Sequence, residues 1–584
     1  MSGLEIVGVV VGIVPIVFKA AGAAWKTLDN TISFDEDTED LGIRLETVKA
    51  HLGIWAGKSG VTQGQLLDAL MPFEELIART LRRVCDLVEE VEGEGQKYGI
   101  FVREVTPSDN RRRSETVIQI SRSFHSVMAS LKERAGVSTL LEREASMQRT
   151  GTESSVSRRV FWAIRERNRF ENFVVSLERH VKGLQAFVVE GERKEIQQEG
   201  TRLALDTIGG LRDPRHLSQL QQASGWSQNF SQVDIHALSQ WKAIALQRAQ
   251  TIGSNGGDAE NWGLAGSTTK DRSCTRFLKK GWFDPSITYL FEKKNYDSNI
   301  SDEHKDLLRE RVRQLISLLA GQYAQRYLHT LQPLGYVDDP DYHCWWIVFR
   351  FSIGPLGCGE LKGNQPLSLR ALYAVPSKPA LESRYKLAKR LITTFVSLYG
   401  GDWMHKGINS TNIIFPCVNF GTSAEGFTSL HTALLQGFNY SRQLTQSQTI
   451  DQGKVLNDLE AAIYRHPHYQ GEAASGYQIQ YDIYSLGLVL FEIATWEPLM
   501  DTLSARPMKQ SPKTLWRDMD YFHEPEAFEL KRKVMIRVKY ELAYRVGTSY
   551  KEAVEWCLNL EQPVTAVEFY TKVAIPLETL DREA

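Results

Sequence analysis

Apolar side chains recur every three or four residues through much of the first 190 positions, with polar side chains between them. This period matches one face of an α-helix and predicts a bundle of amphipathic helices. A further helix is expected over residues 115–134, with polar breaks over residues 93–113 and 150–157. The three clearest stripes, in helices expected over residues 31–55, 70–91 and 159–188, are Leu41, Leu45, Val48, Leu52 and Trp55; Leu70, Ile77, Leu81, Val84, Val88 and Val91; and Phe170, Val174, Leu177, Val181, Leu184 and Val188.

The chain starts with an apolar run over residues 6–18, which Lys19 ends. The run is shorter than the roughly 20 residues of a permanent transmembrane helix, and no basic segment precedes it as in a signal peptide, so we do not expect secretion. Gly8 and Gly12 allow close helix contact in lipid or in a soluble bundle. Both alternatives stay open: a buried first helix, or a helix that leaves the bundle for a membrane. The expected membrane-inserting residues are Ile6, Val9, Val10, Val11, Ile13, Val14, Ile16, Val17 and Phe18.

The second half of the chain alternates short β-patterned runs with helical patterns, which predicts an α+β fold. Between the two halves, residues 253–258 and 263–271 are rich in glycine and serine and indicate a hinge. Strands are expected over residues 287–294, 334–337 and 344–351, and helices over residues 301–327, 381–399 and 531–576.

Composition narrows the function classes. The 584 residues are 42% hydrophobic, enough for two to four domains with their own cores. A net charge of −2 gives no global attraction to nucleic acid. The six cysteines lack the paired spacing of a metal site or a disulfide framework, so we expect buried thiols in a reducing compartment: Cys85, Cys274, Cys344, Cys358, Cys417 and Cys557.

One segment has the outline of a catalytic loop. Residues 405–415 read His-Lys-Gly-Ile-Asn-Ser-Thr-Asn-Ile-Ile-Phe, which resembles the His-Arg-Asp loop of protein kinases, four residues before an Asn. His405 and Asn412 are kept, whereas Gly407 stands where a kinase has the Asp that accepts the proton of the substrate hydroxyl. A glycine cannot act as that base, so the segment predicts a kinase-like loop without its catalytic base.

Three later segments follow in the order of a kinase. Gly437-Phe438-Asn439 replaces Asp-Phe-Gly, which keeps the packing Phe and loses the metal-binding carboxylate. Residues 464–468 resemble the end of an activation segment, with His468 in place of its Glu. Asp482 lies in a run that resembles the helix at the centre of the kinase C-lobe, where the resemblance implies that it holds the loop backbone.

The resemblance to a kinase is weaker in the segments that would bind the nucleotide. Lys293 or Lys294 ends the expected strand that precedes the first helix of this half, and Glu310 or Glu303 lies on that helix, so one such pair is a candidate for the Lys–Glu ion pair of kinases. No Gly-x-Gly-x-x-Gly precedes these lysines to cradle phosphates. We therefore expect no cofactor, with ATP binding doubtful, no metal site and no enzyme activity.

The first 190 residues resemble a fungal HeLo domain of heterokaryon incompatibility proteins. The resemblance is carried by the apolar, glycine-rich start, by residues 34–55 with Ile43, Leu45 and Trp55, and by residues 161–177 with Phe170 and Phe173. It implies a helical bundle whose N-terminal segment enters the membrane and causes cell death. The chain has no Asn-rich tail of the amyloid-forming kind. The pairing with a degenerate kinase-like domain is similar to the mixed lineage kinase domain-like protein of animal necroptosis.

These observations predict a HeLo-like bundle over residues 1–205, a brace and linker over 206–272, and a pseudokinase domain over 273–580. The expected function is a non-catalytic effector of cell death or heterokaryon incompatibility, cytoplasmic until activation brings it to the plasma membrane. Expected partners are membrane lipids, further copies through the bundle and an upstream protein, and no nucleic acid. The alternatives are a soluble scaffold or inhibitory partner without membrane activity and, more remotely, an atypical active kinase.

Overall fold

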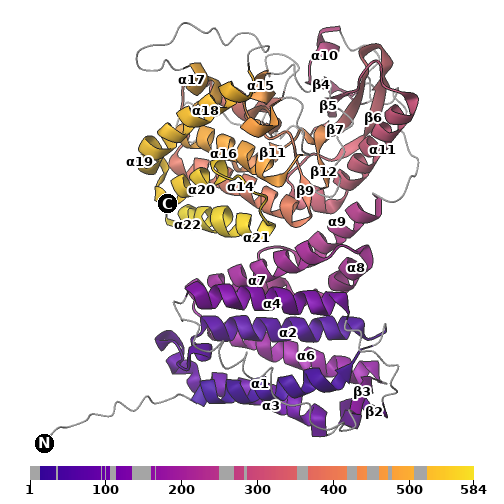
Figure 1. Cartoon of the computed structure of the whole chain (residues 1–584), viewed down its shortest axis with the longest axis vertical. Coiled ribbons are helices and arrows are strands. Elements are labelled where there is room, and N and C mark those ends of the chain that lie inside the picture. The colour runs from indigo at the N-terminus through magenta and orange to yellow at the C-terminus, as the bar shows by residue number, and fades with distance from the viewer. Residues whose placement is uncertain are drawn as a thin grey trace, which may run out of the picture. The chain divides into compact units, whose positions relative to one another are not determined.

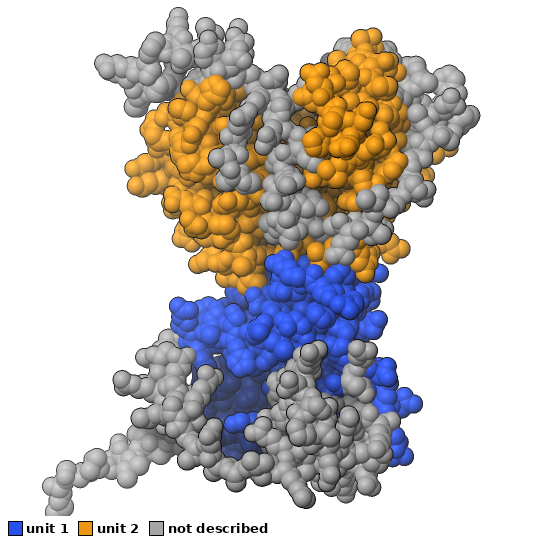
Figure 2. Space-filling model, turned by 45° about the vertical axis from the view of Figure 1, so that its right-hand side comes forward, with its two compact units in different colours: residues 1–243 blue, residues 244–584 orange. Residues whose placement is uncertain are grey.

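The chain divides into two compact units, Met1–Ala243 and Ile244–Ala584, which Figure 2 colours separately. They are seen in a computed structural model. It describes residues 13–34, 37–93, 95–98, 100–104, 114–134, 160–164, 166–248, 269–281, 284, 286–351, 366–416, 430–443, 459–470, 477–504 and 522–583. Each unit is considered by itself below.

The first unit is a helical bundle organised around α2 (Figure 1). This helix packs against α4, α6, α7 and α8, and its Trp55 is fully buried. Every member of the three predicted apolar stripes lies in the core, which confirms the helical pattern. The bounds of the helices are α1 Ile13–Thr31, α2 Glu39–Lys58, α3 Glu74–Gly93, α4 Glu115–Arg134, α6 Arg167–Leu184, α7 Glu190–Gly210, α8 Pro214–Ala223 and α9 Ile235–Arg248.

A small sheet that we did not predict completes this unit. Its strands are β1 (Ile32–Ser33), β2 (Ile100–Glu104) and β3 (Val160–Ile164), in the order β1-β3-β2, with β3 antiparallel to β2 and parallel to β1. The predicted helix over residues 159–188 therefore begins with a strand, and the unit is not purely helical. Val and aromatic side chains favour the extended conformation at β3, but its partners are distant in sequence.

The described part of the apolar run, residues 13–18, is only partly buried. On α1, Val14, Trp25 and Leu28 are in the core, whereas Ile13 and Ile16 are 53% and 59% exposed and Val17 and Phe18 are half-buried. The predicted inserting residues Ile6, Val9, Val10 and Val11 lie outside the described residues. The alternative of a buried first helix therefore does not hold for Ile13 and Ile16. Among the described helices, none combines the length and apolar character needed to cross a membrane.

The bundle extends past the predicted boundary at residue 205. His51 of α2 stacks on Phe230, with ring centroids 4.3 Å apart, and meets Trp226 edge-on at 5.7 Å. Phe230 is fully buried, and Gly200 of α7 lies beneath it, so close that a Cβ would meet the Phe230 carbonyl oxygen at 1.8 Å. Most of the segment expected to be a brace therefore belongs to the first unit.

The second unit begins with an antiparallel sheet in the order β4-β5-β7-β6. Its strands are β4 Arg276–Lys280, β5 Thr288–Asn295, β6 Pro333–Asp339 and β7 Cys344–Phe351. The predicted strands at residues 287–294, 334–337 and 344–351 are thus confirmed. The expected helix over residues 301–327 is divided into α11 (Asp302–Leu319) and α12 (Gln322–Tyr327) at Gly321, and α11 packs on β6.

The rest of the second unit is mainly helical (Figure 1). α16 is buried along its whole length, and the predicted helix over residues 381–399 is confirmed as α14. The bounds are α10 Thr269–Ser273, α13 Leu369–Leu372, α14 Leu381–Gly400, α15 Leu459–Ala462, α16 Ile479–Thr495, α17 Leu499–Ser504, α18 Glu524–Arg537, α19 Ala543–Val546, α20 Thr548–Leu558, α21 Ala566–Phe569 and α22 Ile575–Glu583, with short strands β8 Leu367–Ser368, β9 Trp403–Met404, β10 Ile413–Phe415, β11 Leu434–Leu435 and β12 Arg442–Gln443.

Four of the six cysteines are described, and all four are free thiols. Cys85, Cys344 and Cys557 are buried as predicted, whereas Cys274 is half-buried. Cys358 and Cys417 lie outside the described residues.

The buried His51 makes the stability of the first unit depend on pH. Both ring nitrogens lack a hydrogen-bond partner, and burial lowers the pKa of His51 to about 3 from 6.5. Residues 224–231, which carry the stacked rings, hold no titratable side chain, and on α7 the nearby Glu199 is already paired with Arg202. Below pH 6.5, His51 is protonated in the unfolded chain but stays neutral in the folded chain. The free energy of unfolding therefore falls by about 1.4 kcal/mol for each unit by which the pH decreases.

The free energy of unfolding of residues 1–243 should decrease between pH 7.5 and pH 5.5. We predict that this decrease is about 1.4 kcal/mol smaller in His51→Leu, because the variant has no imidazole to take up the proton on unfolding. Urea unfolding at the two pH values measures this. His125→Gln, at an exposed position of α4, is the control for removing a histidine from the same unit. An unchanged dependence in His51→Leu would show that the folded ring takes up the proton.

Candidate functional site

Asp482 fixes the loop that resembles a kinase catalytic loop, residues 405–412, called here the degenerate loop. Its carboxylate is fully buried on α16 and accepts the backbone N–H groups of His405 at 2.6 Å and Lys406 at 2.8 Å. The Tyr477 hydroxyl donates a third hydrogen bond at 2.6 Å. Lys406 adopts a left-handed φ of 64°, which turns two successive N–H groups toward one carboxylate. Burial raises the pKa of Asp482 to about 6, and the three donors oppose that shift.

The degenerate loop packs directly against Gly437-Phe438-Asn439, called here the degenerate triplet. The buried His405 ring lies edge-on to Phe438, with centroids 4.5 Å apart. The Gly407 N–H donates to His405 Nδ1 at 3.2 Å, and the Asn412 amide donates to the Gly407 carbonyl. The structure therefore brings together the predicted residues of both motifs, which lie more than 20 positions apart in the sequence.

The backbone favours glycine at residue 437 and leaves little room for a side chain at residue 407. Gly437 has a left-handed φ of 86°, and a Cβ there would lie 2.3 Å from Asn412 Nδ2. A Cβ on Gly407 would lie 3.0 Å from the Gly437 carbonyl oxygen. Real Cβ atoms do not approach other heavy atoms as closely as the contact at residue 437, so Asn412 would have to move there, whereas the contact at residue 407 is tight.

Two residues that sequence reasoning missed join the sheet to both motifs. Arg276 of β4 donates to the Thr411 carbonyl and to Asn412 Oδ1, both at 2.7 Å. It also forms an ion pair with Glu292 of β5 at 2.7 Å, and the two side chains are only 12% and 2% exposed. Glu292 in turn accepts the N–H of Gly437 at 3.2 Å. This Arg276–Glu292 pair is the central polar contact of the site.

The predicted lysines lie on opposite faces of β5. Lys293 donates to the Arg272 carbonyl at 2.9 Å, and its Nζ lies 5.5 Å from the Trp346 ring centroid. Lys294 is buried on the same face as Glu292, with its Nζ 3.8 Å from the centroid of Tyr440. Side chains alternate between the two faces of a strand, so residues 292 and 294 lie on the same face. This alternation could have identified Glu292 from the sequence.

The two carboxylate candidates lie on α11. Glu310 contacts Arg313, one turn along the helix, at 3.6 Å, and Glu303 is exposed. The carboxylate that meets the degenerate triplet is therefore the strand residue Glu292. Asn439, the last residue of the triplet, donates through its side-chain amide to the Lys293 carbonyl at 2.9 Å.

A second buried carboxylate supports the segment that ends at His468. Glu492 of α16 accepts the Tyr464 hydroxyl at 2.7 Å and the Leu499 N–H at 2.6 Å. Burial raises the pKa of Glu492 to about 7. His468, at the position of the kinase Glu, contacts Glu524 at 3.1 Å with both side chains more than half exposed. Within the described residues, no cluster of three or more His, Cys, Asp or Glu side chains is placed to hold a metal ion.

These elements define the class of the second unit. A small antiparallel sheet, a helix after its second strand, a loop held by a buried Asp, and a helical part in the expected order make a protein-kinase-like fold. Gly407 and Gly437 are the residues that the sequence motifs predict at the catalytic and metal-binding positions. The chain as a whole is therefore a multidomain protein with an N-terminal helical unit and a C-terminal α+β unit.

Comparison with known proteins identifies the first unit. Residues 6–220 match the family model described as HeLo, prion-inhibition and propagation, so the chain carries a HeLo domain. Among solved structures, vaccinia related kinase 3 is similar at 12% identity and a TM-score of 0.31, over 52% of this chain and 81% of that chain. A search of curated proteins found no match. The evidence for the kinase-like fold is the element order and the contacts given above.

Removing Arg276 should cost far more stability than an exposed ion pair. We predict that Arg276→Ala lowers the free energy of unfolding of the second unit by about 3–5 kcal/mol, because Glu292 is left buried without its partner. Arg309→Ala breaks the more exposed pair with Asp306 and should cost less than about 1 kcal/mol. Chemical denaturation of the full chain measures both. Replacing Arg276 and Glu292 together by Met should cost less than Arg276→Ala, and a larger loss would contradict the pairing.

Restoring the two carboxylates should not restore a kinase. We predict that Gly407→Asp with Gly437→Asp destabilises the second unit by about 2 kcal/mol or more and gives no phosphotransfer, because of the strained φ at residue 437 and the overlap with Asn412. Thermal unfolding with and without ATP and Mg²⁺, and a phosphotransfer assay, measure this. Gly321→Ala, whose Cβ makes only an ordinary contact, is the control. A metal-dependent stabilisation by ATP would overturn the expectation.

Proposed function

We propose that the protein is a non-enzymatic effector of cell death or heterokaryon incompatibility, in which the kinase-like unit regulates the HeLo domain. The observation that carries the proposal is the combination in one chain of a HeLo domain with a kinase-like unit whose carboxylate positions are filled. A cell-death or incompatibility type of function is what the HeLo family suggests. The regulatory part, the membrane target and oligomerisation through the bundle are our inferences.

Loss of catalysis follows from the chemistry of phosphoryl transfer. Kinases depend on a base near the substrate hydroxyl and on carboxylates that hold Mg²⁺ against the phosphates. Gly407 and Gly437 supply neither. The side chains that contact the two motifs are the cation of Arg276, at the degenerate loop, and its partner Glu292, at the degenerate triplet. Without those groups, the second unit acts by binding, and we expect its partner to be an upstream protein.

The first helix supports a membrane role. Its exposed Ile13 and Ile16 continue the apolar run of residues 6–12. Insertion would release the part of α1 that the bundle buries, including Trp25 and Leu28, at about 25 cal/mol per Å² of apolar area. Lipid, or a further copy of the chain, must offset that cost, so membrane entry and oligomerisation are expected to occur together.

A soluble scaffold is the second candidate, and one observation favours it. Val14, Trp25 and Leu28 are each no more than 3% exposed, so the helix is anchored along most of its length. If this anchoring holds under all conditions, α1 never leaves the bundle, and the HeLo domain acts through protein contacts alone.

Liposome leakage separates the two candidates. We predict that residues 1–243 release dye from vesicles that contain anionic lipid, and that Val10→Glu reduces the rate at least roughly tenfold, because a charge in the apolar run is costly to insert. Ala129→Glu, at an exposed position of α4, is the matched control and leaves leakage unchanged. Absence of leakage at every protein concentration would support the scaffold and sink the membrane role.

A further inference from the structure

Large apolar side chains are exposed together at one end of the first unit. Among the described residues of this unit, six such side chains are at least 39% exposed, and they come from three short stretches. Soluble proteins usually expose large apolar side chains singly, whereas a cluster marks a binding surface. The six, called here the end face, are Ile13 and Ile16 at the start of α1, Met71, Phe73 and Leu76 around the start of α3, and Val189 just before α7.

Contacts between the three stretches make the end face one surface. The Ile13 N–H donates to the Glu74 carboxylate at 3.0 Å, so α1 and α3 begin side by side. The two helices then pack along each other (Figure 1). The ring of Phe73 lies 5.7 Å from that of Phe187, centroid to centroid, which brings the segment before α7 to the same place.

A cation follows the apolar tip on both helices. On α1, Lys19 comes three positions after Ile16, and on α3, Arg79 comes three positions after Leu76. Residues three apart lie on the same side of a helix, and both cations are exposed. At 1.5 Å per residue, Lys19 and Arg79 lie about 9 Å and about 8 Å from the first residues of their helices. The two cations therefore form one level behind the apolar tips.

Several acidic side chains at this end are already engaged. Glu74 accepts the N–H that begins α1. Glu75 pairs with Arg79 at 3.3 Å, and this pair is 87% and 72% exposed. Glu190 pairs with Arg193 at 3.4 Å. Because an exposed ion pair contributes little, Arg79 can exchange Glu75 for another anion at small cost.

We propose that the end face docks the folded protein on a phospholipid bilayer before any helix leaves the bundle. The apolar tips enter the boundary between headgroups and acyl chains, and Lys19 and Arg79 meet the lipid phosphates. Elements that lie in this boundary are buried in it by about 5–10 Å, which matches the level of the two cations. Lysine and arginine suit that level because their stems are apolar and their heads are charged.

The position of the apolar run favours lipid as the occupant. Residues 6–12 directly precede Ile13, and seven residues reach at most about 25 Å even when fully extended. A bilayer that takes up the run must therefore lie close to the end face. A second copy of the chain on the same face would instead bring like cations together, which is unfavourable.

This inference rests on the membrane role proposed above and adds a separate step to it. The added step is docking through Met71, Phe73 and Leu76, which lie outside the apolar run. It needs no movement of α1, because these side chains are exposed in the folded bundle.

Flotation of the full chain with vesicles tests the docking. With phosphatidylcholine and phosphatidylserine in equal amounts, we expect binding that Leu76→Glu weakens by roughly tenfold or more, because a charge is costly to place among acyl chains. Lys19→Gln with Arg79→Gln should weaken this binding by roughly tenfold and leave binding to phosphatidylcholine alone unchanged. The proposal fails if the full chain does not float, or if either variant binds the mixed vesicles like the parent chain.

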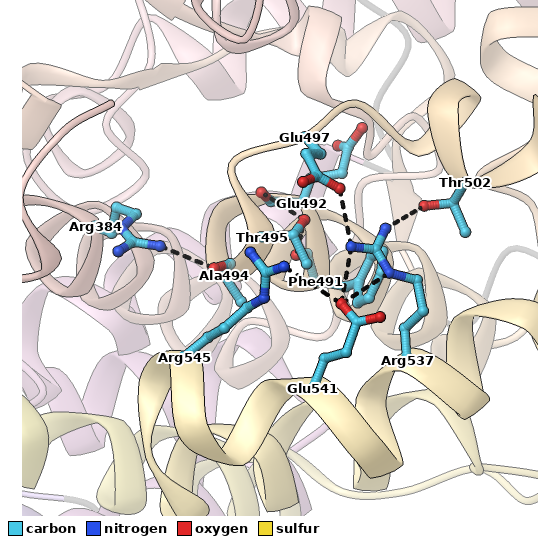
Figure 3. A network of polar contacts seen from close by, with 10 residues as sticks. All are labelled: Arg384, Phe491, Glu492, Ala494, Thr495, Glu497, Thr502, Arg537, Glu541 and Arg545. Carbon is cyan, nitrogen blue, oxygen red and sulfur yellow. Dashed lines mark hydrogen bonds and ion pairs between the residues drawn. The ribbon is translucent and has the colours of Figure 1, made fainter. Parts of the chain in front are cut away.

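The matched control lies on the second unit. Ile536 of α18 is 45% exposed, against 46% for Leu76. The other side of α18 is held by Arg537, which contacts Glu497 at 2.9 Å and the Thr502 hydroxyl at 3.0 Å (Figure 3). Ile536→Glu should therefore fold and should bind vesicles like the parent chain. Equal weakening by Ile536→Glu and Leu76→Glu would show non-specific adsorption and refute the proposal.

A dye at residue 76 reports the contact without adding a charge. Leu76→Cys labelled with an environment-sensitive dye should shift its emission to the blue with vesicles, and lipids with a quencher on the acyl chain should quench it. The parent chain is the blank for the native thiols. Leu307→Cys on α11, at a position that is 45% exposed, should show neither effect. A response at residue 76 to protein concentration alone, without vesicles, would assign the end face to a second copy and contradict the proposal.

Docking and membrane insertion can fail separately. Vesicle binding without leakage would keep the docking face and remove the insertion of the apolar run. Leakage that Leu76→Glu leaves unchanged would keep the proposed function and remove the docking face.

Discussion

The kinase-like unit depends on one buried ion pair, Arg276 with Glu292. A buried charge is tolerated only when its partner and its hydrogen bonds are in place. Arg276 has Glu292 as its partner and also donates to the degenerate loop, and Glu292 also accepts from the degenerate triplet. Separating the sheet from these motifs would leave the ion pair without its hydrogen bonds to Thr411, Asn412 and Gly437. The sheet is thus tied to the motifs by the protein's own side chains, at the place where a kinase presents a lysine to nucleotide phosphates.

The changes at the two motifs are consistent with one another. Loss of the carboxylate at position 437 allows a left-handed backbone that only glycine adopts easily, and this backbone brings its N–H toward Glu292. Loss of the carboxylate at position 407 lets the Asn412 amide reach the Gly407 carbonyl. Asn412, which binds a metal in kinases, here contacts the loop backbone and Arg276. The two motifs thus support each other, and Asp482 holds the backbone of the degenerate loop.

Sequence patterns predicted what depends on local order and missed what depends on distant pairs. The apolar stripes of α2, α3 and α6, and the strands around Lys293, are set by short-range periodicity and were found. The position of Asp482 could be inferred because its motif is contiguous. Arg276 could not, since nothing near residue 276 reports the loop 135 positions away. For the same reason, the sequence did not predict the pairing of β2 with β3 or the stack of His51 on Phe230. Without that stack, the predicted end of the bundle came too early in the chain.

If the second unit regulates α1 by binding, as we propose, the trigger must supply a definite amount of free energy. A ligand shifts an equilibrium only by the difference between its affinities for the two states, so a tenfold shift needs about 1.4 kcal/mol. Holding α1 in the bundle involves Trp25, Leu28 and Val14, each burying apolar area that contributes about 1.5–3 kcal/mol for a large side chain. A single weak binding event on the second unit would therefore leave the helix in place. Release needs several contributions acting together, and lipid contact by the already exposed Ile13 and Ile16 is one that the first unit offers before any helix has moved.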